Sequence, residues 1–433
     1  MKFVFGTRGR QVREMCQVDT SHALVRYPND LAPRRVEGVD LVLEPARRRT
    51  GFQPNVVLTS TESTAPLADA SASAIADTLA RHPGSRLIAV DGWQYDTAAK
   101  IPRARQLTLT YPAATIDVVV TMTVWATGRH HVHLTASYAA DDTRSVEPVF
   151  RWIARELRVK AAPDAVERAA RTVGAAALDS RLSQKVSFPL EDLTPFAPAP
   201  FVSQGLRISV GTLDALRAGA ARARIASPYG LLPQHTRESL VAAETRAAGF
   251  TDESGKLTAT GHAVAASLQS ERQVLLARSS DTRRNAILLA YAGPGVVCVL
   301  HDPALSEPVD HATEPDAPLR HVLVVHPSRL PALTASWLGM RPTLPVYDSK
   351  KRTIKASALR SGARDAPVGT WTESWRSVYV RTSVGDLVDV VEPDGRWYRP
   401  EPPVAGVQEL IPDTDSAVYA HLLASVSFPP DRG

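Results

Sequence analysis

The chain has 433 residues, which is too long for one ordinary hydrophobic core and predicts roughly two or three domains. Hydrophobic residues make up 44% of the sequence and charged residues 22%, a composition that excludes an intrinsically disordered protein. The net charge of +5 comes from 50 basic and 45 acidic residues, and so small a surplus does not indicate nucleic-acid binding.

Two cysteines, Cys16 and Cys298, lie far apart in the sequence. This spacing excludes a cysteine-based zinc site and a disulfide scaffold, and it fits a reducing cytoplasm. Residues 1–13 carry charges and lack the apolar core of a secretory signal, and no apolar run reaches the length of a membrane span. We therefore expect a cytoplasmic protein without membrane insertion.

The first half of the chain predicts a sheet covered by helices. A helical pattern over residues 65–81 precedes two strand patterns, 115–125 and 132–138, in which apolar residues alternate with polar ones. A second helical pattern over 144–158 presents apolar residues at helical spacing and would close over the sheet.

Three sequence phrases in this half carry a family resemblance. They are Gly51-Phe52-Gln53-Pro54-Asn55-Val56-Val57-Leu58-Thr59, Asp91-Gly92-Trp93-Gln94-Tyr95 and the strand residues 118–137. Over residues 20 to 160 the chain resembles the LpqN-type domains of actinobacteria, which have a Mog1/PsbP-like fold. The resemblance implies an antiparallel sheet with packed helices in a binding or accessory module, and it implies no chemistry.

The middle of the chain predicts a domain boundary. A helical pattern over 164–185 is followed by residues 188–203, which contain four prolines. Because proline denies backbone donors and favours extended chain, this segment is interpreted as a linker. The predicted divisions are a domain at 1–160, a helix and proline-rich linker at 161–204, and a second domain at 205–433.

The second half again mixes strands and helices. The predicted helices are 212–222, 236–248, 258–269, 330–339 and 414–425, and the predicted strands are 206–210, 273–278, 285–292, 295–301, 321–326 and a hairpin at 377–398. The predicted fold class is therefore α+β, with two domains that each pack helices on an antiparallel sheet.

This order of elements carries a second resemblance. Its pieces are the helix 237–249, the Gly255-Lys256-Leu257 turn, the strand pair 286–292 and 295–300, the strand-to-helix step 326–338, and Asp394-Gly395-Arg396-Trp397. Over residues 206 to 425 the chain looks like the EspG-type cytosolic chaperones of the actinobacterial type VII secretion system. The resemblance implies a protein that binds a helical secreted substrate. A long segment at 345–369 departs from the family pattern.

The densest metal candidate is the run His130-His131-Val132-His133. Because His131 and His133 would point to one face of a strand, both could bind zinc, with Asp117 as a conceivable third ligand. The alternative is that the histidines line a solvated face opposite Val132 and Leu134. We favour that alternative, because no carboxylate or cysteine lies at ligand spacing, and we predict neither a metal nor a cofactor.

Residues 237–292 contain two further patterns that resemble known motifs. The loop Gly249 to Lys256 has the wrong glycine spacing for a phosphate loop, and Leu257 stands where a Ser or Thr must bind magnesium. The helix, turn and helix at 237–268 could belong to a winged-helix domain, but the second helix offers no arginine or lysine for DNA. Both are interpreted as structural.

The predicted function is that of a non-enzymatic cytosolic chaperone or adaptor of type VII secretion that binds a helical secreted protein. The candidate contact regions are the loops 279–284 and 302–319, with Arg284, Asp310, Trp371 and Trp375 as partner-binding residues. For the two tryptophans, packing over the sheet edge remains an equal alternative. A small-molecule or lipid-binding module, or an enzyme of unrecognised family, remains an alternative for the whole chain.

Overall fold

The computed structural model describes most of the chain. The described residues are 14–47, 51–95, 102–160, 190–218, 234–281, 284–307, 319–344, 352–361, 375–382, 385–391 and 395–426. The chain divides into two compact units. Unit 1 comprises residues 1–198, 341–348 and 414–416, and unit 2 comprises the remainder. Both units consist of antiparallel sheets packed with helices, so the fold is α+β, as the sequence predicts.

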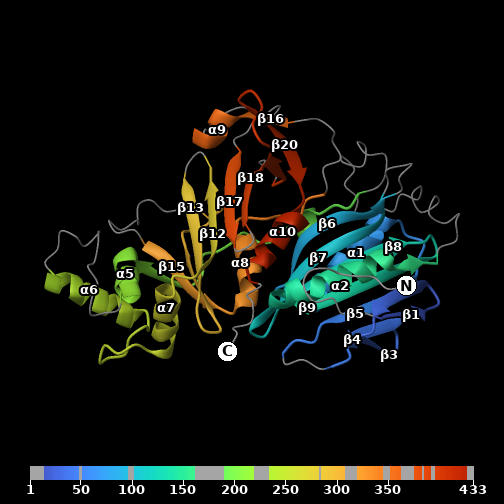
Figure 1. The fold of residues 1–433 in the computed structure, drawn as a ribbon, viewed down its shortest axis with the longest axis horizontal. Coiled ribbons are helices and arrows are strands. Elements are labelled where there is room, and N and C mark those ends of the chain that lie inside the picture. The colour runs from blue at the N-terminus through green and yellow to red at the C-terminus, as the bar shows by residue number, and fades with distance from the viewer. Residues whose placement is uncertain are drawn as a thin grey trace. The chain divides into compact units, whose positions relative to one another are not determined.

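Unit 1 is built on a seven-stranded sheet in the order β3-β4-β5-β9-β8-β7-β6 (Figure 1). Its strands are β3 (Leu31–Arg34), β4 (Leu41–Pro45), β5 (Asn55–Glu62), β6 (Arg86–Tyr95), β7 (Pro102–Ala113), β8 (Ile116–Ala126) and β9 (His130–Ala139). A three-stranded sheet, β1 (Met15–Asp19), β2 (Ala23–Pro28) and β10 (Arg158–Val159), accompanies it. Every pairing is antiparallel, which short hairpin connections allow.

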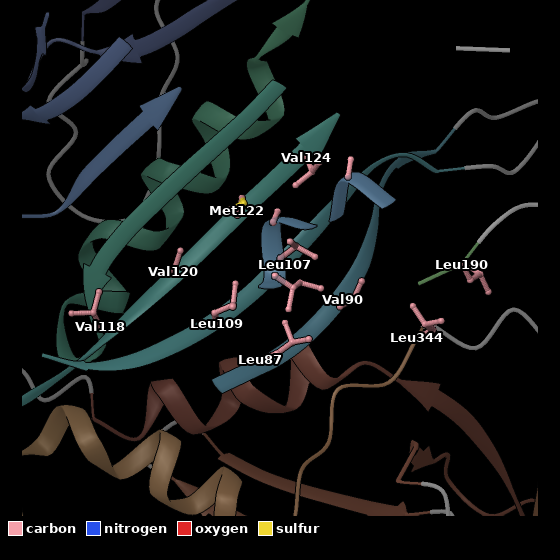
Figure 2. Packing of buried hydrophobic residues seen from close by; sticks show 13 residues of the cluster. Leu87, Val90, Leu107, Leu109, Val118, Val120, Met122, Val124, Leu190 and Leu344 are labelled. Atoms are coloured by element: carbon pink, nitrogen blue, oxygen red, sulfur yellow. The ribbon is translucent and has the colours of Figure 1, made fainter. Parts of the chain in front are cut away.

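Helices cover both faces of this sheet. On one face, Val118, Val120, Met122 and Val124 of β8 form a core cluster with apolar residues of α1 (Leu67–Arg81), as Figure 2 shows for the strands. The other face packs under α2 (Thr143–Glu156). The shared face predicted for Val118, Val120, Met122 and Val124 is therefore confirmed, but β8 is buried on both faces and not on one.

The proline-rich segment predicted to be a linker contributes to the core of unit 1 instead. Leu190 is buried in the α1-side cluster, and Leu193 and Phe196 pack against it as partly buried residues. Proline removes backbone donors but does not prevent its neighbours from burying apolar side chains, and that explains the difference. Leu344, distant in sequence, joins the same cluster. The predicted helix at 164–185 lies outside the described residues.

Unit 2 is built on a ten-stranded antiparallel sheet in the order β11-β15-β14-β13-β12-β17-β18-β19-β20-β16. The strands are β11 (Leu206–Ser209), β12 (Gln273–Ser280), β13 (Asn285–Ala292), β14 (Val297–His301), β15 (Leu319–Val325), β16 (Arg352–Lys355), β17 (Arg376–Thr382), β18 (Gly385–Val391), β19 (Trp397–Pro400) and β20 (Val407–Asp413). The predicted strands of this half are all present, whereas β16 and β20 were not predicted.

The β11 end of this sheet carries the helices α5 (Val210–Ala218), α6 (Gln234–Ala247) and α7 (Ala259–Gln269). Glu244 of α6 accepts hydrogen bonds from the backbone N and the hydroxyl of Ser209, at 2.6 and 2.5 Å, and so fastens α6 beside the start of α5. The turn between α6 and α7 is closed by Asp252 Oδ1, which accepts from the backbone N of Ser254 and of Lys256. The predicted helices 236–248 and 258–269, with a turn between them, are therefore present as α6 and α7.

Three further helices belong to the fold: α8 (Leu330–Trp337), α9 (Ala356–Ser361) and α10 (Asp415–Ala424). None of the helices within the described ranges is both long and apolar enough to cross a bilayer.

Gly261 in α7 provides a test of the packing between the helix and its preceding turn. A Cβ at this position would lie 2.0 Å from the carbonyl oxygen of Phe250, and that oxygen accepts the backbone N–H of Thr258 at 2.9 Å. Gly261→Ala should therefore destabilise the protein by roughly 1–3 kcal/mol, although alanine normally stabilises a helix. Urea unfolding measures the change. Ala266→Gly, at an exposed position of α7, should cost no more than about 1 kcal/mol.

Candidate functional site

The β19–β20–β16 end of the unit 2 sheet exposes aliphatic side chains. Val404 is 78% exposed, Val407 42% and Ile411 37%. Val407 and Ile411 lie four residues apart on β20, so they point to the same face of the sheet. Exposed aliphatic side chains at the end of a sheet are candidates for contact with another molecule. We define the open sheet end as Val404, Val407, Ile411 and the residues paired with them.

The turn that carries Val404 is held rigidly. The backbone N of Val404 donates to the carbonyl of Val407 at 2.8 Å, and the backbone N of Val407 donates back at 3.0 Å. Between them, Ala405 and Gly406 have φ values of 50° and 81°. Positive φ at both central residues is what a type I′ hairpin turn requires, so Val404 projects from a fixed backbone.

Cationic side chains border the aliphatic residues. Arg399 of β19 pairs in register with Ile411, and its side chain is 59% exposed. Lys355 of β16 pairs in register with Val407 and is also exposed. Arg399 Nη1 lies 3.9 Å from Asp413 Oδ2, a distance at which the pair adds little stability on a surface. The open sheet end therefore carries charges of both signs beside its aliphatic residues, because Glu409 and Asp413 of β20 share the face of Val407 and Ile411.

A buried carboxyl lies one strand further into the sheet. Asp389 of β18 is 0% exposed, and neither of its carboxylate oxygens has a hydrogen-bond partner among the described residues. Because Val390 pairs with Tyr398 in the antiparallel register, Asp389 lies opposite Arg399 on the neighbouring strand. Burial, with a smaller contribution from repulsion by Asp413, raises the pKa of Asp389 to about 7 against the opposing attraction of Arg399. At neutral pH this carboxyl is therefore close to half protonated.

Two of the residues predicted to bind a partner are engaged within unit 2. The Arg284 guanidinium donates to the backbone carbonyls of Ala304 and Glu307, the latter at 2.7 Å. Ser279, in the same predicted contact loop, is buried. Trp375 is 1% exposed, so it fills the core and cannot serve as a surface anchor. The other two predicted residues, Asp310 and Trp371, lie outside the described residues.

The histidine pair of β9 lies on one face of its strand, as predicted, but that face turns toward α1 and both histidines are half-buried. The two rings lie with centroids 6.4 Å apart, and His131 Nε2 donates to the carbonyl of Ala65 at 3.0 Å. Burial and the nearby His131 together lower the pKa of His133 to about 4, against the opposing effect of Asp77. Asp117 pairs with Pro112 at the far end of β8. The described part of the chain holds no group of three residues suited to a metal.

A small cavity lies between α2 and the sheet of unit 1. Its volume is about 20 Å³, and Gln106, Thr121, Thr123, Tyr138, Glu147 and Arg151 contribute polar atoms to its lining. Ligand pockets typically have volumes of roughly 300–1,000 Å³, and a cavity of this size accommodates about one water. The cavity therefore gives no support to a small-molecule or lipid site at this place.

Comparison with known proteins gives no family assignment. No protein-family model matches the chain, and no curated protein matches it. Similar solved structures include the cyanobacterial PsbP of Synechocystis, 16% identical, which covers 36% of this chain and 98% of its own with a TM-score of 0.27. They also include LpqN of Mycobacterium tuberculosis, 14% identical, which covers 34% of this chain and 90% of its own, again with a TM-score of 0.27.

A protein of Bacteroides thetaiotaomicron, 10% identical, covers 63% of this chain and 84% of its own with a TM-score of 0.21. The first half of the sequence resembles LpqN-type domains with a Mog1/PsbP-like fold. Structures of PsbP and of LpqN are both among these similar structures, and each covers about a third of the chain. At these TM-scores the likeness carries no inference about function. The EspG-type resemblance of the second half rests on the sequence alone.

Several buried charged residues were not identified from the sequence, and three of them matter here. They are Arg105, Glu191 and Asp389. For Asp389 the sequence held a signal. Strand alternation places its carboxyl on the same face as the apolar residues Leu387 and Val391. Its pairing partner Val378 is itself buried, and this places Asp389 on the covered face.

The buried carboxyl of Asp389 predicts how the stability of the protein depends on pH. Because its pKa is raised in the folded protein, the folded state binds the proton more tightly than the unfolded chain, and the free energy of unfolding should fall as pH rises from about 4 to about 7. Asp389→Asn should remove most of that loss and stabilise the protein at pH 8 by roughly 4 kcal/mol relative to wild type. Denaturant unfolding at pH 5 and pH 8 measures it.

The matched control is Asp386→Asn on the same strand. Asp386 is exposed, and hydrogen bonds from Arg381 and Tyr379 lower its pKa, so its replacement should not stabilise the protein at pH 8. Equal pH dependence of wild type and Asp389→Asn would show that Asp389 does not carry this effect.

Proposed function

We propose that the protein is a non-enzymatic cytoplasmic adaptor whose second unit binds a helical protein secreted by a type VII system. The open sheet end is the surface that makes this contact. This assignment replaces the two predicted loops, because the described parts of those loops are tied to their own chain through Arg284. No cofactor takes part in the proposed function.

The observation that carries the proposal is the exposure of Val404, Val407 and Ile411 on a backbone fixed by pairing. An amphipathic helix places apolar residues at i, i+3, i+4 and i+7, which gives a stripe that can lie across such a strand face. Since the side chains project from paired backbone, ordering them costs little conformational entropy on binding.

The border of the surface specifies the kind of helix. Arg399 and Lys355 flank the aliphatic residues and are exposed. Acidic residues of the client would complement Arg399 and Lys355, and basic residues would complement Glu409 and Asp413, which share the face of Val407 and Ile411. The proposed client is therefore a small helical protein whose apolar stripe is bordered by charges of both signs.

Tagged full-length protein purified from its native host tests the proposal. The wild-type chain should retain a small helical protein in stoichiometric amount, identified by mass spectrometry and circular dichroism. Val407→Asp combined with Ile411→Asp removes apolar contact and adds unpaired negative charge. The double variant should weaken titrated client binding by roughly 3 kcal/mol, or about a hundredfold.

Val202→Asp is the control, because Val202 is an exposed valine of unit 2 outside the open sheet end. It should leave client binding unchanged, and all variants should keep the wild-type unfolding curve. Equal retention by the double variant, or a retained partner without helical structure, would contradict the proposed surface.

A further inference from the structure

A row of three side chains leads from the interior of the unit 2 sheet to the open sheet end. Asp389 of β18 lies opposite Arg399 of β19, and Arg399 pairs in register with Ile411 of β20. Side chains of residues paired in this way point to the same face of a sheet. The row therefore begins with a carboxyl that is 0% exposed, continues with a side chain that is 59% exposed, and ends at an aliphatic residue of the proposed client surface.

The carboxyl at the interior end of this row lacks compensation. Neither oxygen of Asp389 has a hydrogen-bond partner among the described residues. A buried carboxylate without a hydrogen bond or an ion pair is costly, whereas a buried neutral carboxyl costs much less. The arrangement therefore suits the protonated form of Asp389, and loss of the proton creates a charge that draws a cation toward it.

Two charged residues among those described act on Asp389, and they act in opposite directions. Asp413 of β20 repels a carboxylate at this position, and Arg399 attracts it. Arg399 Nη1 lies 3.9 Å from Asp413 Oδ2 near the surface, and Glu409 lies on the same face of β20, two residues before Ile411. Because a surface contact at that distance is worth little, the guanidinium can turn from solvent toward Asp389 when Asp389 is charged.

The neighbouring elements place their own cations elsewhere. β17 places a buried, uncharged valine opposite Asp389. Arg376 of that strand lies two positions further along the same face, and its guanidinium donates to the carbonyl of Leu338. His421 of α10 acts on the exposed carboxyl near the start of β18. Within the described part of the chain, Arg399 is therefore the cation placed to respond to a charged Asp389.

We propose that proton binding at Asp389 sets the direction of Arg399, so that the open sheet end holds its client more tightly in mildly acidic than in mildly alkaline solution. With Asp389 protonated, Arg399 extends beside Ile411 and meets a carboxylate of the client. With Asp389 charged, Arg399 turns inward and the client carboxylate loses its partner. The inference rests on the proposed function, because it concerns the regulation of the same surface.

The test measures the fluorescence anisotropy of a labelled, end-blocked helical peptide titrated with the full-length chain at pH 6 and pH 8. The peptide carries leucines at i, i+3, i+4 and i+7, with glutamates along one border and lysines along the other. It contains no histidine or cysteine, so its own charge stays constant between these pH values. Burial raises the pKa of Asp389 to about 7, which lies between them. Wild type should bind the peptide about fivefold more tightly at pH 6, the effect of one exposed ion pair.

Four comparisons assign the effect. Asp389→Asn stands in for the protonated carboxyl and should bind with the tighter affinity at both pH values, whereas Arg399→Gln should bind with the weaker affinity at both. Asp386→Asn is the matched control, since Asp386 is an exposed carboxyl of the same strand whose pKa is lowered, and it should keep the wild-type difference. Val407→Asp combined with Ile411→Asp should weaken binding at both pH values, which locates the peptide on the open sheet end. A peptide with glutamine in place of each glutamate should bind wild type equally at both.

Equal binding of the glutamate peptide by wild type at pH 6 and pH 8 overturns the inference, and so does a folded Asp389→Asn variant that keeps the wild-type difference. In both cases the peptide still binds, so the proposed surface stands. Absence of peptide binding at both pH values overturns the proposed surface and the inference together. Circular dichroism at each pH checks that every variant is folded.

Discussion

The need to cover both faces of an antiparallel sheet shapes this protein more than any other constraint. In unit 1 the strands β8 and β9 turn apolar residues to opposite sides, so neither face can be left in water, and α1 and α2 each take one. In unit 2 the sheet extends to β20 and β16, where Val407 and Ile411 remain exposed. The proposed binding surface is the place where this covering is incomplete.

Buried charge follows from the same geometry. Arg105 on β7 and Asp389 on β18 occupy strand positions whose side chains point to a covered face, so alternation forces each of them into the interior. Their fates differ. Arg105 meets the carboxylate of Glu191 at 2.7 Å and remains paired, whereas burial, and to a lesser extent the nearby Asp413, raises the pKa of Asp389. The buried Arg105 is compensated by an ion pair, whereas the raised pKa of Asp389 makes the stability of the protein depend on pH.

Local pattern predicted the elements better than it predicted their surroundings. The alternation over 115–125 and the helical spacing over 65–81 indicated β8 and α1 correctly, because both depend on neighbours within a few residues. Glu191 could not be found in this way, since its partner Arg105 lies 86 residues away. The burial of Trp375 likewise depends on packing that polar neighbours in sequence do not reveal. Of the predicted contact residues, Trp375 thus follows the alternative of core packing, and Asp310 and Trp371 lie outside the described residues.

The edge strand beside the open sheet end indicates how a partner approaches. β16 has four residues, and Lys355 at its end is exposed. Short edge strands that carry lysine resist the addition of another strand, because pairing would bring the charge against a neighbouring chain. The neighbouring face is different, since Val407 and Ile411 of β20 offer apolar contact without unpaired backbone groups. A helix laid across this face would satisfy its own backbone hydrogen bonds and contribute side chains alone, so the proposed helical client would suit this surface better than an extended one.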